Sequence, residues 1–82
     1  METLAALQPG HKARIAAVEG DDTTALRLLE MGLTAGEEVV LLGYAPLGDP
    51  IEYSLRGYRV SLRASEAERV LVETVGPAEV VE

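Results

Sequence analysis

The most regular feature of the chain is the alternation of apolar and polar residues along residues 51–55 and 58–62. Arg56 and Gly57 separate the two stretches, as a two-residue turn separates the arms of a β-hairpin. With that turn, apolar residues face each other in the pairs Leu55 with Tyr58, Tyr53 with Val60, and Ile51 with Leu62. A shift of one residue would expose the whole apolar set to water, so this register is strongly specified. The pattern therefore predicts an antiparallel hairpin with one buried face.

Similar patterns predict strands at residues 11–18, 37–44 and 70–75, and a helix at residues 24–31. In the first strand Ala13, Ile15 and Ala17 share one side, and further apolar residues near its end indicate a bulge or burial on both sides. Residues 39–42 are apolar on both faces, so we expect both faces of that strand to be covered, with the helix as one candidate cover. Short turns are expected at residues 4–7 and 64–68, the second with Ser65 and Glu68 at capping-box spacing.

The predicted helix has a start signal and a stop signal. Residues 21–23, Asp-Asp-Thr, can accept hydrogen bonds from the free amides of its first turn. Gly32 lies where a helix commonly ends in a left-handed conformation, and Leu33 can fold back as its apolar partner. Two helical turns are not stable alone, so the helix must pack on the sheet. The spacing predicts two overlapping apolar faces for this packing, one of Leu26 and Leu29 and one of Ala25, Leu29 and Leu33.

Five short strands in 82 residues must curl to bury their shared face. We therefore expect an all-β fold with one short helix: a small SH3-like five-stranded partly open barrel with a helical insertion between strands 1 and 2. The domain is expected to span residues 1–76, and residues 77–82 are expected to form a short C-terminal tail.

Charge and composition narrow the classes of function. Fourteen acidic and seven basic residues give a net charge of −7, unlike the basic surface of a nucleic-acid-binding protein. The absence of cysteine excludes disulfides and thiolate metal sites. The start resembles no signal peptide, and the longest apolar run is far shorter than the ~20 residues of a membrane span. We expect a cytoplasmic protein without membrane insertion, whose oligomeric state stays open.

The sequence offers little reactive chemistry, and we expect no catalytic residues, no metal site and no cofactor. His11 is the single histidine, and no serine or threonine has an evident base. A weak ferrous site of His11, Asp21 and Asp22 is an alternative, although one histidine cannot form a two-histidine facial triad. Phosphate-loop motifs are absent from the sequence. The chain has three tyrosines and no Trp or Phe, so we do not expect an aromatic groove for polyproline peptides. An extended peptide could still add along a barrel edge.

The predicted docking surface combines the helix end with the loop of residues 45–50. Pro46 and Pro50 stiffen this loop, and stiff exposed loops commonly carry binding surfaces. A two-turn helix cannot bury all of its apolar residues, so we expect at least one of Leu28 and Met31 at the surface and count both as candidates. In the alternative, both lie in the core and Leu47 covers the barrel end. The predicted partner-binding residues are Leu28, Met31, Leu47, Asp49, Arg56 and Arg59.

The arginines of this set belong to the hairpin, together with Arg63. Two interpretations are open. Arg56, Arg59 and Arg63 either form a solvated face that balances nearby carboxylates, as Glu52 could do for Arg59, or form a small cationic site for an acidic partner.

Three blocks of residues resemble the FeoA family. They are Arg27-Leu28-Leu29-Glu30-Met31-Gly32-Leu33 with Gly36, Ala45-Pro46-Leu47-Gly48-Asp49-Pro50, and Arg56-Gly57-Tyr58 with Ser61-Leu62-Arg63 and Glu66-Ala67. The resemblance extends from about Leu4 to Val75, with the blocks in the family's order. It implies a small cytosolic SH3-like domain that is a non-catalytic accessory protein in bacterial ferrous iron uptake. The implied partner is FeoB, a membrane transporter with a cytosolic GTPase domain.

Two other functions stay open. One is the SH3-like regulatory domain of iron-dependent repressors, which resembles FeoA but normally follows a basic DNA-binding domain and a metal site. The other is an RNA- or ribosome-associated SH3-like barrel, suggested faintly by the spacing within residues 10–20 and disfavoured by the net charge.

Overall fold

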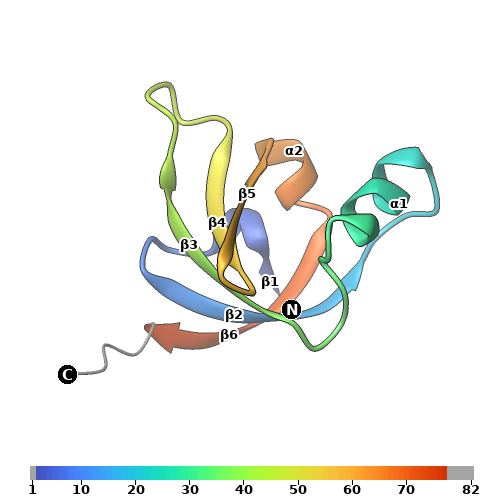
Figure 1. The fold of residues 1–82 in the computed structure, drawn as a ribbon, viewed down its shortest axis with the longest axis horizontal. Helices are drawn as coiled ribbons and strands as arrows, with labels where there is room; N and C mark the ends of the chain where they lie inside the picture. Colours follow the sequence, from blue (N-terminus) through green and yellow to red (C-terminus); the bar gives the residue numbers. More distant parts are fainter. Residues whose placement is uncertain (1, 78–82) are drawn as a thin grey trace.

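A computed structural model describes residues 2–77 of the chain. These residues form one antiparallel sheet in the order β1-β6-β2-β3-β4-β5, with two short α-helices and one 3₁₀ helix. In chain order the elements are β1 (Glu2–Thr3), η1 (Leu4–Ala6), β2 (His11–Val18), α1 (Thr23–Glu30), β3 (Glu38–Tyr44), β4 (Ile51–Leu55), β5 (Tyr58–Leu62), α2 (Ala64–Ala67) and β6 (Val70–Pro77). The sheet is strongly curved, and α1 follows one end of β2 (Figure 1). The predicted all-β fold with a helix between its first two long strands is confirmed.

The sheet has one strand more than the sequence predicts. β1 contains two residues, and it pairs with β6 through Glu2 opposite Val72 and Thr3 opposite Leu71. A two-residue strand is too short to carry a pattern of alternation, so the apolar periodicity of the chain could not reveal it. The short turn expected at residues 4–7 is the 3₁₀ helix η1.

The predicted hairpin is present in the predicted register. Leu55 pairs with Tyr58, Tyr53 with Val60, and Ile51 with Leu62. Arg56 and Gly57 have φ angles of +55° and +87°, the positive values that a tight hairpin turn of this twist requires. The apolar side of this hairpin, except Tyr58 at its end, joins the buried core formed with Leu4, Leu7, Ala13, Ile15, Leu28, Leu33, Val39, Leu41, Ala67, Val70 and Val72.

Helix α1 begins and ends as the sequence predicts. The carboxylate of Asp22 accepts a hydrogen bond from the Ala25 amide at 3.1 Å. At the other end Gly32 has a φ of +102°, and the amides of Gly32 and Leu33 donate to the carbonyls of Leu29 and Leu28 at 3.0 and 3.2 Å. This pair of bonds turns the chain back toward the core on the Leu28 side of the helix.

The predicted packed face of α1 is correct for Ala25 and Leu33 and wrong for Leu26 and Leu29. Leu28 and Ala25 are buried, whereas Leu26 and Leu29 are 57% and 41% exposed. Two apolar stripes run along this helix at helical spacing, and spacing alone does not distinguish them. The closing bonds at Gly32 decide the outcome, because they place Leu33 and Leu28 together in the core.

The strands β2 and β3 also differ in detail from expectation. Leu42 is 44% exposed, so β3 is not covered on both faces as predicted. Helix α1 packs mainly against β2. In β2 the pairing with β6 shifts between Ile15 and Ala17, which confirms a bulge near the strand end. The bulge moves Ala17 to the exposed side, away from Ala13 and Ile15.

The C-terminal strand extends as far as Pro77. Residues 78–82, which make up most of the predicted tail, lie outside the described residues, so the predicted domain boundary stays a prediction. In the described part of the chain, every helix is too short or too polar to cross a membrane.

Candidate partner-docking surface

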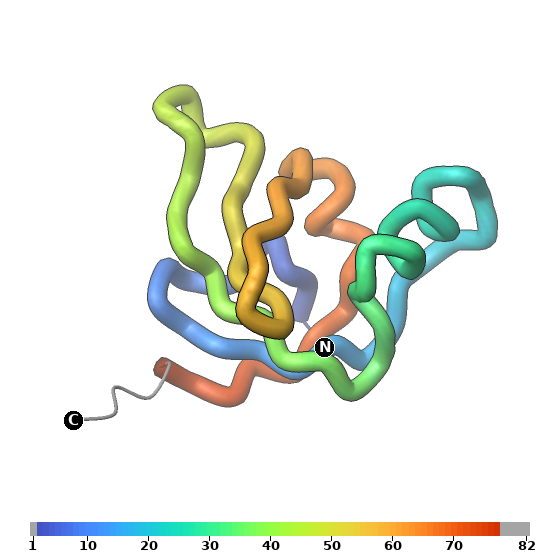
Figure 2. The backbone as a smooth tube through the Cα atoms, in the orientation of Figure 1, coloured from blue at the N-terminus to red at the C-terminus, as the bar shows by residue number. Residues whose placement is uncertain are grey.

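The loop of residues 45–50 projects from the sheet between β3 and β4. Its own backbone closes it, because the Ala45 amide donates to the Pro50 carbonyl at 2.9 Å and the Gly48 amide donates to the Ala45 carbonyl at 2.7 Å. Leu47 stands at its tip and is 96% exposed, the most exposed large apolar side chain among residues 2–77. In the view of Figure 2 this loop and α1 project on opposite sides of the molecule, with α2 between them.

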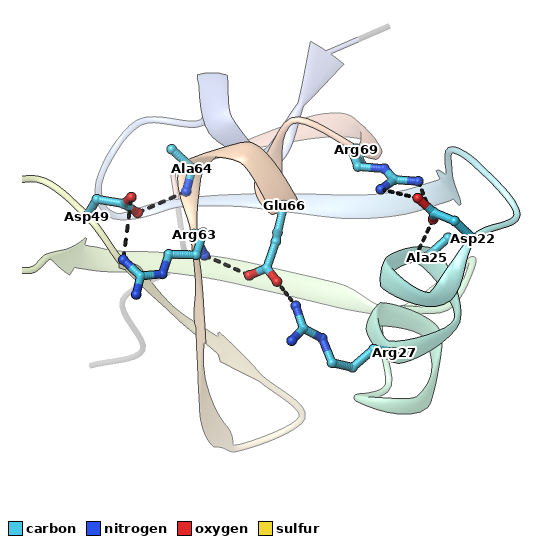
Figure 3. A network of polar contacts seen from close by, with 8 residues as sticks. All are labelled: Asp22, Ala25, Arg27, Asp49, Arg63, Ala64, Glu66 and Arg69. Carbon is cyan, nitrogen blue, oxygen red and sulfur yellow. Dashed lines mark hydrogen bonds and ion pairs between the residues drawn. The ribbon is translucent and has the colours of Figure 1, made fainter.

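Asp49 anchors this loop to the start of α2. One carboxylate oxygen accepts the Ala64 amide at 2.9 Å, and the other lies 4.0 Å from an Arg63 guanidinium nitrogen (Figure 3). An exposed carboxylate that satisfies the first amide of a helix acts as a cap supplied by a distant loop. Asp49 therefore fixes the loop that displays Leu47.

A second carboxylate continues the connection from α2 to α1. The Arg63 amide donates to Glu66 Oε1 at 2.9 Å, and the other Glu66 oxygen forms an ion pair with Arg27 of α1 (Figure 3). The pair that caps α2 is thus Arg63 with Glu66, and the predicted pair Ser65 with Glu68 is wrong by two positions. The helix begins at Ala64, two residues earlier than that pair requires, directly after Arg63 at its N-cap.

The loop base and the end of α1 meet at one depression of about 310 Å³, lined by Arg27, Met31, Pro50, Ser61, Arg63 and Glu66. We use the name loop–helix surface for the set Met31, Leu47, Pro50 and Arg63. Met31 is half-buried and packs against the core, and its carbonyl accepts a hydrogen bond from the Tyr58 hydroxyl at 2.9 Å. The end of α1 is therefore held in place beside the depression.

Two of the predicted partner-binding residues do not fit this surface. Leu28 is fully buried, so its expected exposure is wrong, for the packing reason given above. Strand β4 runs from Ile51, next to the loop, to Leu55, and Arg56 lies in the turn that follows. Arg56 is therefore at the opposite end of β4 from the loop. Arg59 lies on β5, between that turn and the depression.

The hairpin arginines are each matched by a carboxylate. Arg56 lies 3.7 Å from Glu37 and Arg59 lies 3.6 Å from Glu52. The same holds for all seven Lys and Arg residues of the chain, each with a carboxylate oxygen within 4.0 Å. A hairpin face without surplus positive charge favours the solvated-face interpretation and disfavours phosphate binding.

The Asp22–Arg69 pair joins the start of α1 to the segment before β6. Two guanidinium nitrogens of Arg69 donate to the Asp22 carboxylate at 2.7 and 3.1 Å (Figure 3). One of them also donates to the Glu19 carbonyl at 3.1 Å. The Arg69 hydrogen bond, and after it the Ala25 amide, hold the pKa of Asp22 at about 2. Asp22 therefore stays ionised down to strongly acidic pH.

Sequence analysis missed Arg27, Glu66, Arg69 and Tyr58 as positioning residues. Their partners are distant in sequence, as for Arg69 and Asp22, which lie 47 positions apart. A one-dimensional pattern carries no signal for such pairs. The blocks of the family resemblance contain Arg27, Tyr58 and Glu66 but do not indicate their partners, and Arg69 lies outside them.

The geometry gives no support for the alternative ferrous site. His11 begins β2 and residues 21 and 22 follow its other end, so a strand of eight residues separates them by roughly 23 Å. Asp22 is also engaged by Arg69 and Ala25. Across residues 2–77 there is no group of three or more His, Cys, Asp or Glu side chains placed to hold a metal ion.

The chain folds as a curved antiparallel sheet of short strands, with a helix after its first long strand. Asp49 holds the loop of residues 45–50 to the start of α2. This architecture is that of a small SH3-like domain. The chain belongs to the FeoA family, because the FeoA domain model matches residues 2–74.

Relatives support this assignment. A protein of Porphyromonas gingivalis described as a fusion of Fe(2+) transport protein A and the Fe(2+) transporter FeoB is 39% identical over 72 residues, which are 88% of this chain and 8% of that protein. Iron(II) transport protein A of Clostridium thermocellum has a solution structure with a TM-score of 0.83 and 38% identity, and the match covers 89% of this chain and 45% of that one. This chain therefore spans less than half of either relative.

The SH3-like description comes from a third relative. The crystal structure of Stenotrophomonas maltophilia FeoA, described as a prokaryotic SH3 domain protein and complexed with zinc, has a TM-score of 0.78 and 35% identity, covering 89% of this chain and 91% of that one. The fold also occurs in a manganese-dependent transcriptional repressor, with a TM-score of 0.81, 17% identity and coverage of 90% of this chain and 36% of that one. At that identity the likeness concerns the fold alone.

Proposed function

We propose that this protein is a non-catalytic accessory protein of ferrous iron uptake, which acts in the cytoplasm by contact with a FeoB-type transporter. The observation that carries the proposal is the relative in which a FeoA domain and FeoB form one polypeptide. Fusion keeps two domains at a high effective concentration, an arrangement that serves domains that work together.

The loop–helix surface is the contact that we propose. Leu47 presents an almost fully exposed apolar side chain on a loop closed by its own hydrogen bonds. Such a loop loses little conformational entropy on binding, because its backbone is already ordered. Met31 and Pro50 add apolar contacts at the adjacent depression, and Arg63 with Arg59 supplies a polar margin. Contact with the cytosolic GTPase domain of FeoB is part of this proposal.

The experiment measures binding of the protein to the cytosolic domain of the FeoB from the same genome, with and without a GTP analogue. Leu47→Asp is expected to weaken binding about tenfold or more, as for an exposed apolar anchor, with the unfolding midpoint unchanged. Leu42→Asp is the matched control, since Leu42 is also an exposed leucine but lies within β3, away from the loop tip. It is expected to bind as the wild type does.

Two results would count against the proposal. Failure of the wild-type protein to bind the FeoB domain under any nucleotide condition would reject that domain as the partner. Equal loss of binding in both variants, or no loss in Leu47→Asp, would reject the loop–helix surface as the contact.

A further inference from the structure

The outer face of α1 carries two leucines that the described structure leaves partly exposed. Leu26 is 57% and Leu29 is 41% exposed, and their spacing of three places them side by side on the helix. Arg27 and Met31, which line the depression at the loop–helix surface, lie on nearly the opposite side of the same helix. The two leucines therefore belong to a separate surface.

This face is hollowed next to the leucines. A depression of about 450 Å³ lies between the turn that precedes α1 and the helix itself, and its lining includes Asp21, Thr23, Ala25, Leu26 and Leu29. The turn forms one wall, and the Asp22–Arg69 pair fixes it in place. A fixed apolar hollow on a helix face can accept apolar side chains from another helix, because ridges of one helix pack into grooves of another.

The margin of the hollow carries more carboxylates than cations. Arg69 lies against its Gly20–Asp22 wall, but its guanidinium is already engaged by Asp22. In the described residues every lysine and arginine is paired with one of six carboxylates, and neither Asp21 nor Glu30 is among these. Asp21 lines the hollow, and Glu30 lies one turn from Leu26 on the same side of the helix. A partner with cationic side chains around an apolar stripe complements this face twice, because its apolar stripe matches the hollow and its cations match the carboxylates.

We propose that the Leu26–Leu29 face of α1, with Asp21 and Glu30 at its margin, docks a basic amphipathic helix of a partner protein. The net charge of −7 favours approach of such a segment and repels nucleic acid, anionic membranes and a second copy of this chain. A helical occupant fits because the two leucines and the hollow lie along a helix face rather than a sheet edge. This surface is additional to the contact proposed above for FeoB.

The test is a titration of the ¹⁵N-labelled protein with a synthetic 14-residue helical peptide that has leucines on one face and lysines elsewhere. Binding is expected to shift the amide signals of residues 21–30 and to weaken as salt concentration rises. A peptide of the same composition, scrambled so that its leucines share no face, is expected to bind about tenfold more weakly or worse. A third peptide with glutamate in place of lysine is expected not to bind.

Protein variants locate the surface. The double variant Leu26→Ser, Leu29→Ser is expected to weaken binding about tenfold or more, and Leu42→Ser is expected to leave it unchanged. Glu30→Gln is expected to weaken binding about twofold to fivefold at low salt, whereas Glu73→Gln, at an exposed carboxylate on β6, is expected to have no effect.

Any of four outcomes would overturn the proposal. The first is that the peptide shifts only signals of residues outside 21–30, and the second is that the scrambled or glutamate peptide binds equally well. The third is self-association of the protein through this face without peptide. The fourth is binding of the protein to anionic vesicles through the same leucines. None of them depends on whether FeoB binds the loop–helix surface.

Discussion

The packing of α1 predicts that Leu28→Ala and Leu29→Ala, at adjacent positions of one helix, differ sharply in their effect on stability. Leu28 is 0% exposed and lies in the core beside Leu33. Truncation there removes buried methyl groups and leaves a cavity, at a cost of about 2–5 kcal/mol. Leu29 is 41% exposed, so truncation removes less buried area, and alanine is the better helix former. Its cost is expected to be about 1 kcal/mol or less.

These magnitudes can be measured by urea denaturation followed by circular dichroism. A domain of this size has a total stability of about 4–12 kcal/mol, so Leu28→Ala removes a large part of it. With a denaturant slope of about 1 kcal/mol per molar, the urea midpoint falls by about 2 M or more for Leu28→Ala and by about 1 M or less for Leu29→Ala. Leu28→Met, which nearly preserves the side-chain volume, is expected to cost less than about 1.5 kcal/mol and keeps the comparison valid should Leu28→Ala not fold. Equal midpoints for the two alanine variants, or a larger loss at Leu29, would refute the packed face described above.

Two further predictions concern polar groups. Tyr53→Phe is expected to lower the free energy of unfolding by about 1 kcal/mol, and the melting temperature by about 4–8 °C, because the buried hydroxyl donates to the Leu4 carbonyl at 3.0 Å. Tyr58→Phe, at an exposed hydrogen bond of 2.9 Å, is its control in the same melting experiment, and an equal loss there would contradict the burial argument. The pKa of Asp22 is about 2 in the folded state, below its ordinary value of 3.8, so the unfolded state binds more protons at acidic pH. The stability that the Asp22–Arg69 pair contributes to the fold is therefore lost as pH falls from about 4 to 2. Asp22→Asn should flatten stability over this window in acid titrations, and an unchanged pH profile would show that the pair is not formed in solution.

Most of the strand pattern was predictable because it depends on local periodicity. The alternation in residues 51–55 and 58–62 permits only one register with a buried face, and that register is the one observed. The ends of α1 were also predictable, because Asp22 and Gly32 act on neighbouring backbone groups. Of the candidate surface, the sequence indicated the exposed Leu47 and the proximity of the helix end to the loop base.

The choice between the two apolar stripes of α1 required the tertiary structure. Leu26 and Leu28 are both leucines on a short amphipathic helix, and which one is buried depends on how the chain leaves Gly32 and where β2 lies. The connection from Asp49 through Glu66 to Arg27 likewise joins three segments that only folding brings together. Local patterns in a sequence determine hydrogen bonds between near neighbours and the faces of strands, whereas contacts between distant segments depend on the whole arrangement of the core.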